Sequence, residues 1–324
     1  MRTLRRLLVL MILLGVAGAI TFYLRPVWLQ MQGTHLTFFL RHIQSNYVAT
    51  PEGRVHYYEA EPRTIPGGGI PIVLVHGLGD RGEAWAEMIP KLRKAGYHVY
   101  VPDLLGYGRS PKPADSDYSV ATQAKLVEDF IQAIGLQKPE VAGWSLGGWV
   151  SLKVALDHPE MIDRLVVYDA AGIDYTRDYP DTVFHPTNEA ELDRLVHLLE
   201  PEAKSLPHFV AVDALRKFAG EQWVIDKTIA SMLTKKDTVE TTLPGIQVPL
   251  LIVWGENDKL LPLKTVGMKM HELDPKSELD VMQGCGHLVP AVCANQAASA
   301  TVDFLRANPV PEGKERTWGP TPGK

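Results

Sequence analysis

The chain has 324 residues, of which 45% are hydrophobic, and this suits one large α/β domain or two small ones with an ordinary core. The formal net charge is -5 at pH 7, and the sequence contains no long cluster of lysine and arginine. These features exclude the basic surface typical of nucleic-acid-binding proteins, so DNA and RNA are not expected partners.

Residues 7–24 (LLVLMILLGVAGAITFYL) carry no charged side chain. As a helix this segment reaches about 27 Å, close to the thickness of the hydrocarbon core of a bilayer. Arg2, Arg5 and Arg6 precede it and only Arg25 follows closely. The positive charge therefore predicts a single span with a cytoplasmic N-terminus and a catalytic domain on the non-cytoplasmic side.

A cleaved signal peptide is the alternative for this segment, because residues 17–19 (AGA) offer a cleavage site of small residues and the protein would then be exported. Apolar residues continue through Leu24, however, and the segment that follows has one apolar side. A retained anchor is therefore favoured. We expect residues 1–45 to form a membrane anchor and a juxtamembrane segment, with the membrane as a partner.

Between residues 46 and 170, short β-branched runs alternate with helical patterns. The predicted strands are PIVLVH (71–76), HVYVPD (98–103), EVAGW (140–144) and RLVVYD (164–169). Strands that alternate with helices in this way predict a mostly parallel sheet with helices on both faces. Residues 46–170 are therefore interpreted as the first part of an α/β core.

The alternation stops between residues 171 and 243, where the sequence becomes polar and helical. An insertion after the sixth strand predicts a helical lid over the carboxyl ends of the strands, where open α/β sheets bind ligands. Residues 244–310, with PLLIVW (249–254), complete the core. The tail, residues 311–324, is predicted from its composition to be disordered.

A G-x-S-x-G pattern, Gly143 to Gly147, lies where a predicted strand meets a predicted helix, which is the context of a nucleophile elbow. The glycines remove side chains that would collide in a tight turn, so that the Ser145 oxygen projects into the cleft. We expect the oxyanion hole to consist of the backbone N–H groups of Leu146 and of Leu78 in HGLG. The simpler alternative for Ser145 is a helix N-cap.

A serine hydroxyl is a weak nucleophile that needs a base, and the base needs an orienting acid. His287, in QGCGHLVP, follows the last predicted strand, and Asp258, in WGENDKLLP, follows the strand before it. Ser145, Asp258 and His287 thus occur in the chain order of a hydrolase triad. Asp169 also ends a predicted strand and is the competing candidate for the acid.

Two other patterns bear on possible ligands. Gly77, Gly79 and Gly82 spell G-x-G-x-x-G, and Asp103 ends the next strand, as in dinucleotide-binding folds. That interpretation gives no role to the three triad candidates, and Asp103 suits a structural turn better. The only two cysteines do not supply a zinc-ligand set, and whether they form a disulfide stays open. No cofactor and no metal ion are expected.

The ordered motifs HGLG, DLLGYGRS, GWSLGG, WGENDKLLP and GCGH resemble the α/β-hydrolase superfamily over about residues 50–308. The resemblance implies Ser145 as nucleophile, Asp258 as acid and His287 as base, with Leu78 and Leu146 at the oxyanion hole. Many relatives carry Glu and Pro after the catalytic histidine, where this chain has AVCAN (291–295), so the start of the last helix is expected to differ.

The N-terminal apolar segment, together with AAGIDYTRDY (170–179) and HPTNEAELDRLVHLL (185–199), looks like the membrane-anchored monoacylglycerol lipases, whose lid opens toward the bilayer. The expected function is therefore a membrane-tethered serine hydrolase that cleaves carboxylic esters of apolar lipids. A carbon–carbon bond hydrolase with the same triad is one alternative, and a non-catalytic scaffold that binds an apolar ligand is the other. The oligomeric state stays open.

Apolar residues of the lid either line an acyl pocket or pack on the core, and for any single residue packing is favoured. These residues are Phe209, Val210, Leu215, Phe218 and Trp223.

Overall fold

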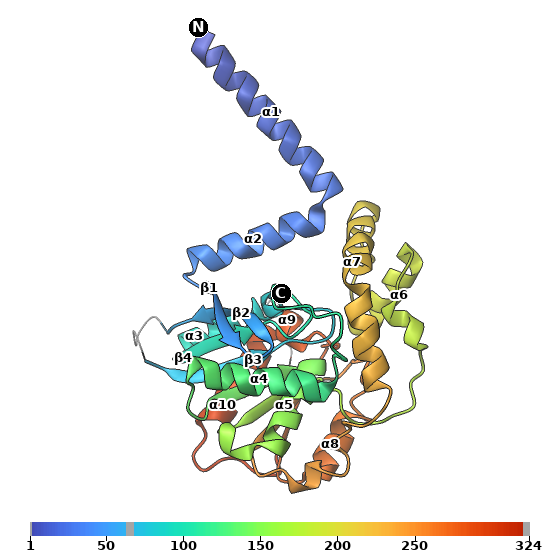
Figure 1. The fold of residues 1–324 in the computed structure, drawn as a ribbon. Helices are drawn as coiled ribbons and strands as arrows, with labels where there is room; N and C mark the ends of the chain where they lie inside the picture. The colour runs from blue at the N-terminus through green and yellow to red at the C-terminus, as the bar shows by residue number, and fades with distance from the viewer. Residues whose placement is uncertain (1, 63–67, 320–324) are drawn as a thin grey trace.

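A mixed β-sheet forms the centre of the molecule, seen in a computed structural model that describes residues 2–62 and 68–319 (Figure 1). The strand order is β1-β2-β4-β3-β5-β6-β7-β8-β9. β2 is antiparallel to both neighbours, and every pair from β4–β3 to β8–β9 is parallel. The strands are β1 (Gln44–Thr50), β2 (Gly53–Ala60), β3 (Ile70–Val75), β4 (Tyr97–Pro102), β5 (Glu140–Trp144), β6 (Leu165–Tyr168), β7 (Leu250–Gly255), β8 (Glu278–Met282) and β9 (Glu315–Trp318).

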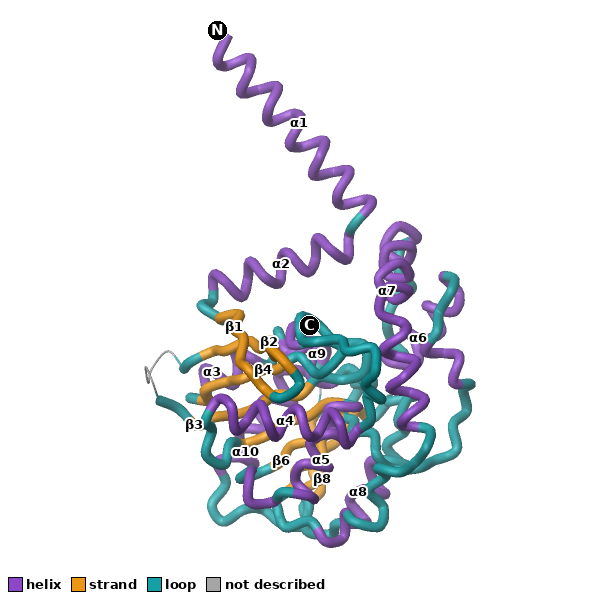
Figure 2. The backbone as a smooth tube through the Cα atoms, in the orientation of Figure 1, coloured by secondary structure: helices purple, strands orange, loops and turns teal. Residues whose placement is uncertain are grey.

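Helices cover both faces of the sheet, as the alternation of strands and helices predicted (Figure 2). Val73 and Val75 of β3 belong to one hydrophobic core, with α4, α5 and α8, whereas Ile72 and Leu74 belong to a second, with α3 and α10. Strands buried on both faces need apolar residues at every position, which explains the unbroken apolar runs in the sequence. The helices of the core are η1 (Gly82–Trp85), α3 (Ile89–Lys94), α4 (Val120–Ile134), α5 (Leu146–Asp157), η2 (Pro159–Met161), α8 (Gly267–Leu273), α9 (Val289–Val292) and α10 (Ala294–Arg306).

The segment between β6 and β7 is a helical lid, which confirms the predicted insertion after the sixth strand. The Asn188 side chain accepts a hydrogen bond from the Glu191 N–H, and the Glu191 carboxylate accepts one from the Thr187 N–H. This reciprocal cap starts the first long lid helix. The lid contains η3 (Asp181–Phe184), α6 (Glu189–Leu199), α7 (His208–Met232) and η4 (Leu243–Gly245).

The N-terminal helix α1 (Arg2–Leu24) extends away from the domain, and α2 (Pro26–Leu40) follows it (Figure 1). Phe22 and Tyr23 contact Phe209 at the tip of α7, with ring centroids 5.6 and 5.3 Å apart. An 18-residue window of α1 has a mean hydropathy of 2.5, and the helix is long and apolar enough to cross a membrane. A signal sequence near an N-terminus has the same length and composition.

The expectation of a disordered tail is wrong for residues 315–318, which form β9 at the edge of the sheet. The Arg316 guanidinium lies 2.8 Å from the Asp280 carboxylate and also pairs with Glu278, and both carboxylates are buried in β8. Buried carboxylates are stabilised by a paired cation, so the contact with Arg316 holds the charged tail against the sheet. Composition alone treats such charges as solvated. Residues 320–324 lie outside the described residues.

Candidate active site

The turn at Ser145 has the strained geometry that the G-x-S-x-G pattern predicted. Ser145 has φ 56° and ψ -117°, a conformation that L-residues rarely adopt. A Cβ on Gly143 would lie 2.2 Å from the Gly147 carbonyl oxygen, and a Cβ on Gly147 would lie 2.2 Å from the carbonyl oxygen of Val75. Only glycine at these two positions lets α5 approach β3 and β5 closely enough to form the turn.

His287 and Asp258 form a buried hydrogen-bonded pair, with 2.8 Å between Nδ1 and Oδ2. The other carboxylate oxygen of Asp258 accepts the N–H groups of Leu260 and Leu261, at 2.8 and 2.9 Å. Because Nδ1–H donates to Asp258, the Nε2 atom of His287 is left as a proton acceptor. The indole N–H of Trp144 donates to the His287 carbonyl oxygen at 2.9 Å, which ties the histidine to the end of β5.

Ser145, His287, Leu78 and Leu146 line one cavity of about 290 Å³ under the lid. Among the described residues the Ser145 hydroxyl makes no hydrogen bond, as is common in unliganded sites where catalytic contacts tighten on binding. Most of the cavity wall is apolar. Its apolar side chains include Trp149, Ile173, Phe184, Leu195, Leu199, Phe218, Ile225, Ile229, Met232, Leu260 and Leu288.

Contacts are given by the structure for three of the five lid residues singled out in the sequence. Phe218 lines the cavity. Phe209 packs on α1 instead, and Trp223 makes an edge contact with Tyr118, with ring centroids 5.8 Å apart. Packing therefore accounts for more of this set than substrate contact does.

The loop after β3 brings Leu78 next to Ser145. A Cβ on Gly77 would lie 3.3 Å from the Cβ of Ser145, so the two loops are in van der Waals contact. Leu146 is the first residue of α5, where backbone N–H groups have no partner within the helix. Both Leu78 and Leu146 line the cavity, as an oxyanion hole at this place requires.

His76 braces this loop. Its Nε2 accepts the Leu104 N–H at 3.0 Å, so its Nδ1–H donates to the Gly77 carbonyl oxygen at 2.9 Å. Burial lowers the pKa of His76, and the neutral ring is the form that makes both hydrogen bonds. His76 therefore joins the loop after β3 to the loop after β4.

Asp103 is a structural residue, as the turn interpretation predicted. Its carboxylate accepts the N–H groups of Gly82 and Arg109, at 2.7 and 2.8 Å, and lies 2.8 Å from Nδ1 of His56. These contacts use both oxygens within the protein. The Asp103 side chain is also buried, so it is not open to a ribose hydroxyl, which the dinucleotide-binding alternative would require.

Two clusters place three possible metal-ligand atoms within 4.8 Å of one another, namely Glu59, Glu61 and His98 at the surface and Asp169, Asp258 and His287 in the site. In each cluster a histidine already makes a hydrogen bond to a carboxylate, of 3.0 Å in the first and 2.8 Å in the second. These hydrogen bonds account for the close approach of the histidine to one carboxylate in each cluster.

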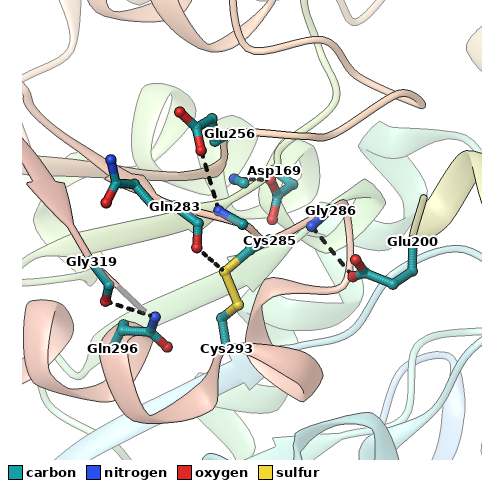
Figure 3. The surroundings of a disulfide bond; sticks show 11 residues. Asp169, Glu200, Glu256, Gln283, Cys285, Gly286, Cys293, Gln296 and Gly319 are labelled. Atoms are coloured by element: carbon teal, nitrogen blue, oxygen red, sulfur yellow. Dashed lines mark hydrogen bonds between the residues drawn. A yellow bond between two sulfur atoms is a disulfide. The ribbon is translucent and has the colours of Figure 1, made fainter. Parts of the chain in front are cut away.

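The His287 loop is also held from two sides, by a disulfide that the sequence left open and by a lid contact that it did not indicate. On one side Cys285 and Cys293 form a disulfide, with 6.3 Å between Cα atoms (Figure 3). On the other side the end of lid helix α6 accepts two backbone N–H groups. His287 donates to the Leu199 carbonyl oxygen at 2.7 Å, and Gly286 donates to the Glu200 carboxylate at 3.3 Å (Figure 3).

The unusual residues after His287 have a structural explanation. Where many relatives start the last helix with Glu and Pro, this chain forms the short helix α9 and then begins α10 directly after Cys293. Cys293 is also the residue that pairs with Cys285, so the disulfide joins the start of α10 to the histidine loop. Neither Leu199 nor Glu200 carries a sequence motif that would have revealed its contact.

Comparison with known proteins gives the family. The family model of the alpha/beta hydrolase fold matches residues 70–200. Lipase 3 of Moraxella sp. (strain TA144) is 30% identical over 237 residues, which cover 69% of this chain and 73% of that protein. The 2-hydroxymuconate semialdehyde hydrolase of Pseudomonas sp. (strain CF600) is 27% identical over 252 residues, 74% of this chain and 88% of that protein.

Among solved structures, the crystal structure of a membrane phospholipase A, a bacterial virulence factor, is similar with a TM-score of 0.76. It is 24% identical, and the match covers 93% of this chain and 98% of that one. The chain therefore belongs to the α/β-hydrolase family.

Proposed function

We propose that the protein is a serine hydrolase that cleaves carboxylic esters of apolar acyl chains, with Ser145 as nucleophile, His287 as base and Asp258 as acid. One observation carries the proposal. A serine in a strained strand-to-helix turn shares an apolar cavity with a histidine whose tautomer a buried carboxylate sets. The likeness to a lipase at 30% identity supports ester hydrolysis.

The reaction has two steps. In the first, His287 Nε2 takes the proton of the Ser145 hydroxyl as Oγ attacks the ester carbonyl carbon. The resulting oxyanion accepts hydrogen bonds from the backbone N–H groups of Leu78 and Leu146. His287 then gives the proton to the leaving alkoxide oxygen, which leaves an acyl group on Ser145. A water molecule repeats the sequence and releases the acid. Asp258 stabilises the imidazolium in both steps, and each oxyanion donor contributes about 3 kcal/mol to the transition state.

The substrate proposed is a lipid ester with one acyl chain, such as a monoacylglycerol. The cavity wall between the triad candidates and the lid is mostly apolar, which suits an acyl chain and offers few groups to hold a polar one. In this proposal α1 is a retained anchor with a cytoplasmic N-terminus, and it keeps the domain at the surface from which such lipids come.

Labelling with a fluorophosphonate probe tests the nucleophile. We expect the wild type to be labelled and Ser145→Ala not to be, with both proteins showing the same thermal unfolding. p-Nitrophenyl esters of graded chain length then give the acyl preference, with longer chains favoured over acetate. An unlabelled, folded wild type would exclude the enzyme and leave the apolar-ligand scaffold.

A carbon–carbon bond hydrolase is the second candidate, because the chain is 27% identical to a 2-hydroxymuconate semialdehyde hydrolase. The same triad serves both reactions, so labelling does not separate them. An assay that compares a vinylogous diketone with the esters separates the two reactions. We expect ester hydrolysis to exceed diketone cleavage, and the opposite order would favour the second candidate.

Deletion of residues 2–24 tests the anchor. The helix contacts the domain through Phe22 and Tyr23 on Phe209, so the truncated protein is expected to fold and to move to the soluble fraction. When the complete chain is expressed, the mass of the protein recovered from membranes distinguishes a retained anchor from a cleaved signal, because cleavage removes N-terminal residues. A C-terminal reporter that is active only outside the cytoplasm tests the orientation.

A further inference from the structure

A second carboxyl group lies beside that of Asp258 in the proposed triad. Asp169 follows β6, is fully buried and has φ 43°, a left-handed conformation. Its Oδ1 accepts the Gly255 N–H at 2.7 Å, while its buried Oδ2 has no hydrogen-bond partner among the described residues. One oxygen of Asp169 lies within 4.8 Å of an oxygen of Asp258 and of a ring nitrogen of His287. Figure 3 shows Asp169 behind the loop that carries Gly286.

The two aspartates differ in how well their negative charge is stabilised. Asp258 accepts two backbone N–H groups and the imidazole N–H, whereas Asp169 accepts one N–H only. Two carboxylates this close in a buried space do not both ionise. Asp258, with three donors, keeps the charge, and Asp169 keeps a proton.

Burial and the neighbouring acids also favour the neutral form of Asp169, and only the hydrogen bond from the Gly255 N–H opposes them. Burial raises the pKa of Asp169 well above its usual value, and the charge of Asp258 raises it further. Glu200, from the end of α6, also opposes its ionisation, and the loop after β8 contributes His287. The neutral carboxyl therefore has a proton to donate, and the neighbouring acceptor is the Asp258 carboxylate.

We propose that Asp169 is a positioning residue and a reserve acid of the triad, a neutral carboxyl that donates to Asp258 and replaces it as partner of His287 when residue 258 carries no charge. The inference rests on the proposed function. In an Asp258→Asn variant the neighbouring negative charge is gone, so Asp169 releases its proton to solvent. Its carboxylate then accepts the Nδ1–H of the His287 imidazolium, directly or through one water.

The test is a comparison of Asp258→Asn with Asp258→Asn/Asp169→Asn. Loss of the triad acid without a substitute costs about 10⁴-fold in kcat. We expect the double variant to show that loss in kcat/KM for a p-nitrophenyl ester, whereas Asp258→Asn alone loses only about 10²-fold, since Asp169 takes over part of the role. Activity of the single variant should also rise with pH as Asp169 ionises, and that of the double variant should lack this rise.

A matched control uses another buried carboxyl. Glu140 begins β5, at the opposite end of that strand from Ser145, and burial raises its pKa to about 8. Asp258→Asn/Glu140→Gln should therefore keep the activity and the pH profile of Asp258→Asn. The Asp169→Asn substitution retains a side-chain oxygen for the Gly255 N–H, so it preserves that structural contact.

Equal kcat/KM values and equal pH profiles for Asp258→Asn and the double variant would overturn the inference. If the double variant does not fold, the pH profile of kcat/KM of the single variant Asp169→Asn tests the inference. An amide donates more weakly than a carboxylic acid and leaves more charge on Asp258, so the acid limb of kcat/KM should move to higher pH, and an unmoved limb would overturn the inference. Failure of the proposed function is distinct, because the wild type would then neither hydrolyse esters nor react with fluorophosphonate.

Discussion

The two halves of the candidate site differ in which elements hold them in place. On the side of Ser145, backbone packs directly on backbone, and Gly147 lies against the carbonyl oxygen of Val75. On the side of His287, the loop is held by the Leu199 carbonyl oxygen of the lid and by the disulfide from Cys285. The histidine loop also packs on the core, since a Cβ on Gly255 would lie 2.0 Å from the Gly286 carbonyl oxygen. The second half differs from the first because it depends in addition on the lid and the disulfide.

This difference implies that changes in the two halves have different consequences. Interiors are close-packed, so a clash between two buried backbones has nowhere to relax. A lid end is a surface turn with more freedom to move. Changes near Ser145 should therefore affect folding and activity together, whereas changes near His287 should affect activity more than folding.

The largest effect is expected from Gly147→Ala. The added Cβ would lie 2.2 Å from the Val75 carbonyl oxygen and 2.5 Å from that of His76. We expect a loss of about 3 kcal/mol or more in the free energy of unfolding, measured by urea denaturation, and no fluorophosphonate labelling. Gly220→Ala, in α7 with open space around it, is the control and should be neutral or slightly stabilising. Wild-type stability of Gly147→Ala would contradict the comparison.

Gly286→Ala is expected to have the second largest effect. Its Cβ would lie 2.6 Å from the Leu199 carbonyl oxygen and 3.0 Å from the Glu200 carboxylate, so the lid end or the histidine loop must shift. A displacement of about 1 Å at a catalytic group lowers the rate about 10²-fold, and we expect a loss of that order in kcat. Unfolding free energy should change by less than half as much as in Gly147→Ala. Similar losses in both quantities would show that the two halves are not different.

Removal of the disulfide should affect activity less than Gly286→Ala does. Cys285 and Cys293 are separated by 8 positions, and a closed loop of this size stabilises a fold by about 2–3 kcal/mol in the chain-entropy model. We expect Cys285→Ser/Cys293→Ser to lose about that much unfolding free energy. The loss in kcat/KM should be smaller than in Gly286→Ala, because the contacts to Leu199 and Trp144 remain. Wild-type protein under reducing conditions should behave in the same way.

The smallest effect concerns Glu200 and pH. Burial raises the pKa of Glu200 above its usual value of 4.5, so the folded state binds the proton more tightly than the unfolded state. The contribution of this group to stability is therefore present below pH 4.5 and is lost as pH rises through the raised pKa. Glu200→Gln should reduce the fall in unfolding free energy above pH 4.5, whereas Glu202→Gln, at an exposed position, should leave it unchanged.

The elements on the Ser145 side could be predicted because their function depends on local spacing. The G-x-S-x-G pattern requires glycine two residues before and two residues after Ser145, and the structure shows the close contacts that enforce it. Asp258 and His287 follow strand ends, and the parallel order of β7 and β8 brings those ends to one edge of the sheet. Motif order therefore predicted that they lie at the same edge of the sheet.

The contacts on the His287 side could not be predicted in the same way. Glu200 and Gly286 are far apart in the chain, and nothing in either local sequence indicates that they meet. The pairing of the two cysteines depends on how α9 turns the chain back toward residue 285. The prediction for the tail was wrong for the same reason, since Arg316 pairs with carboxylates that only the sheet brings near it.

The amino-acid sequence by itself determined the α/β architecture, the helical insertion and the residues proposed to carry out the chemistry, because periodicity and motif spacing are local properties of the chain. Only the tertiary structure decided that Asp258 and not Asp169 contacts His287 through a hydrogen bond, and that the lid and the disulfide hold the histidine loop. Those outcomes depend on distances between residues remote in the chain, which folding alone establishes.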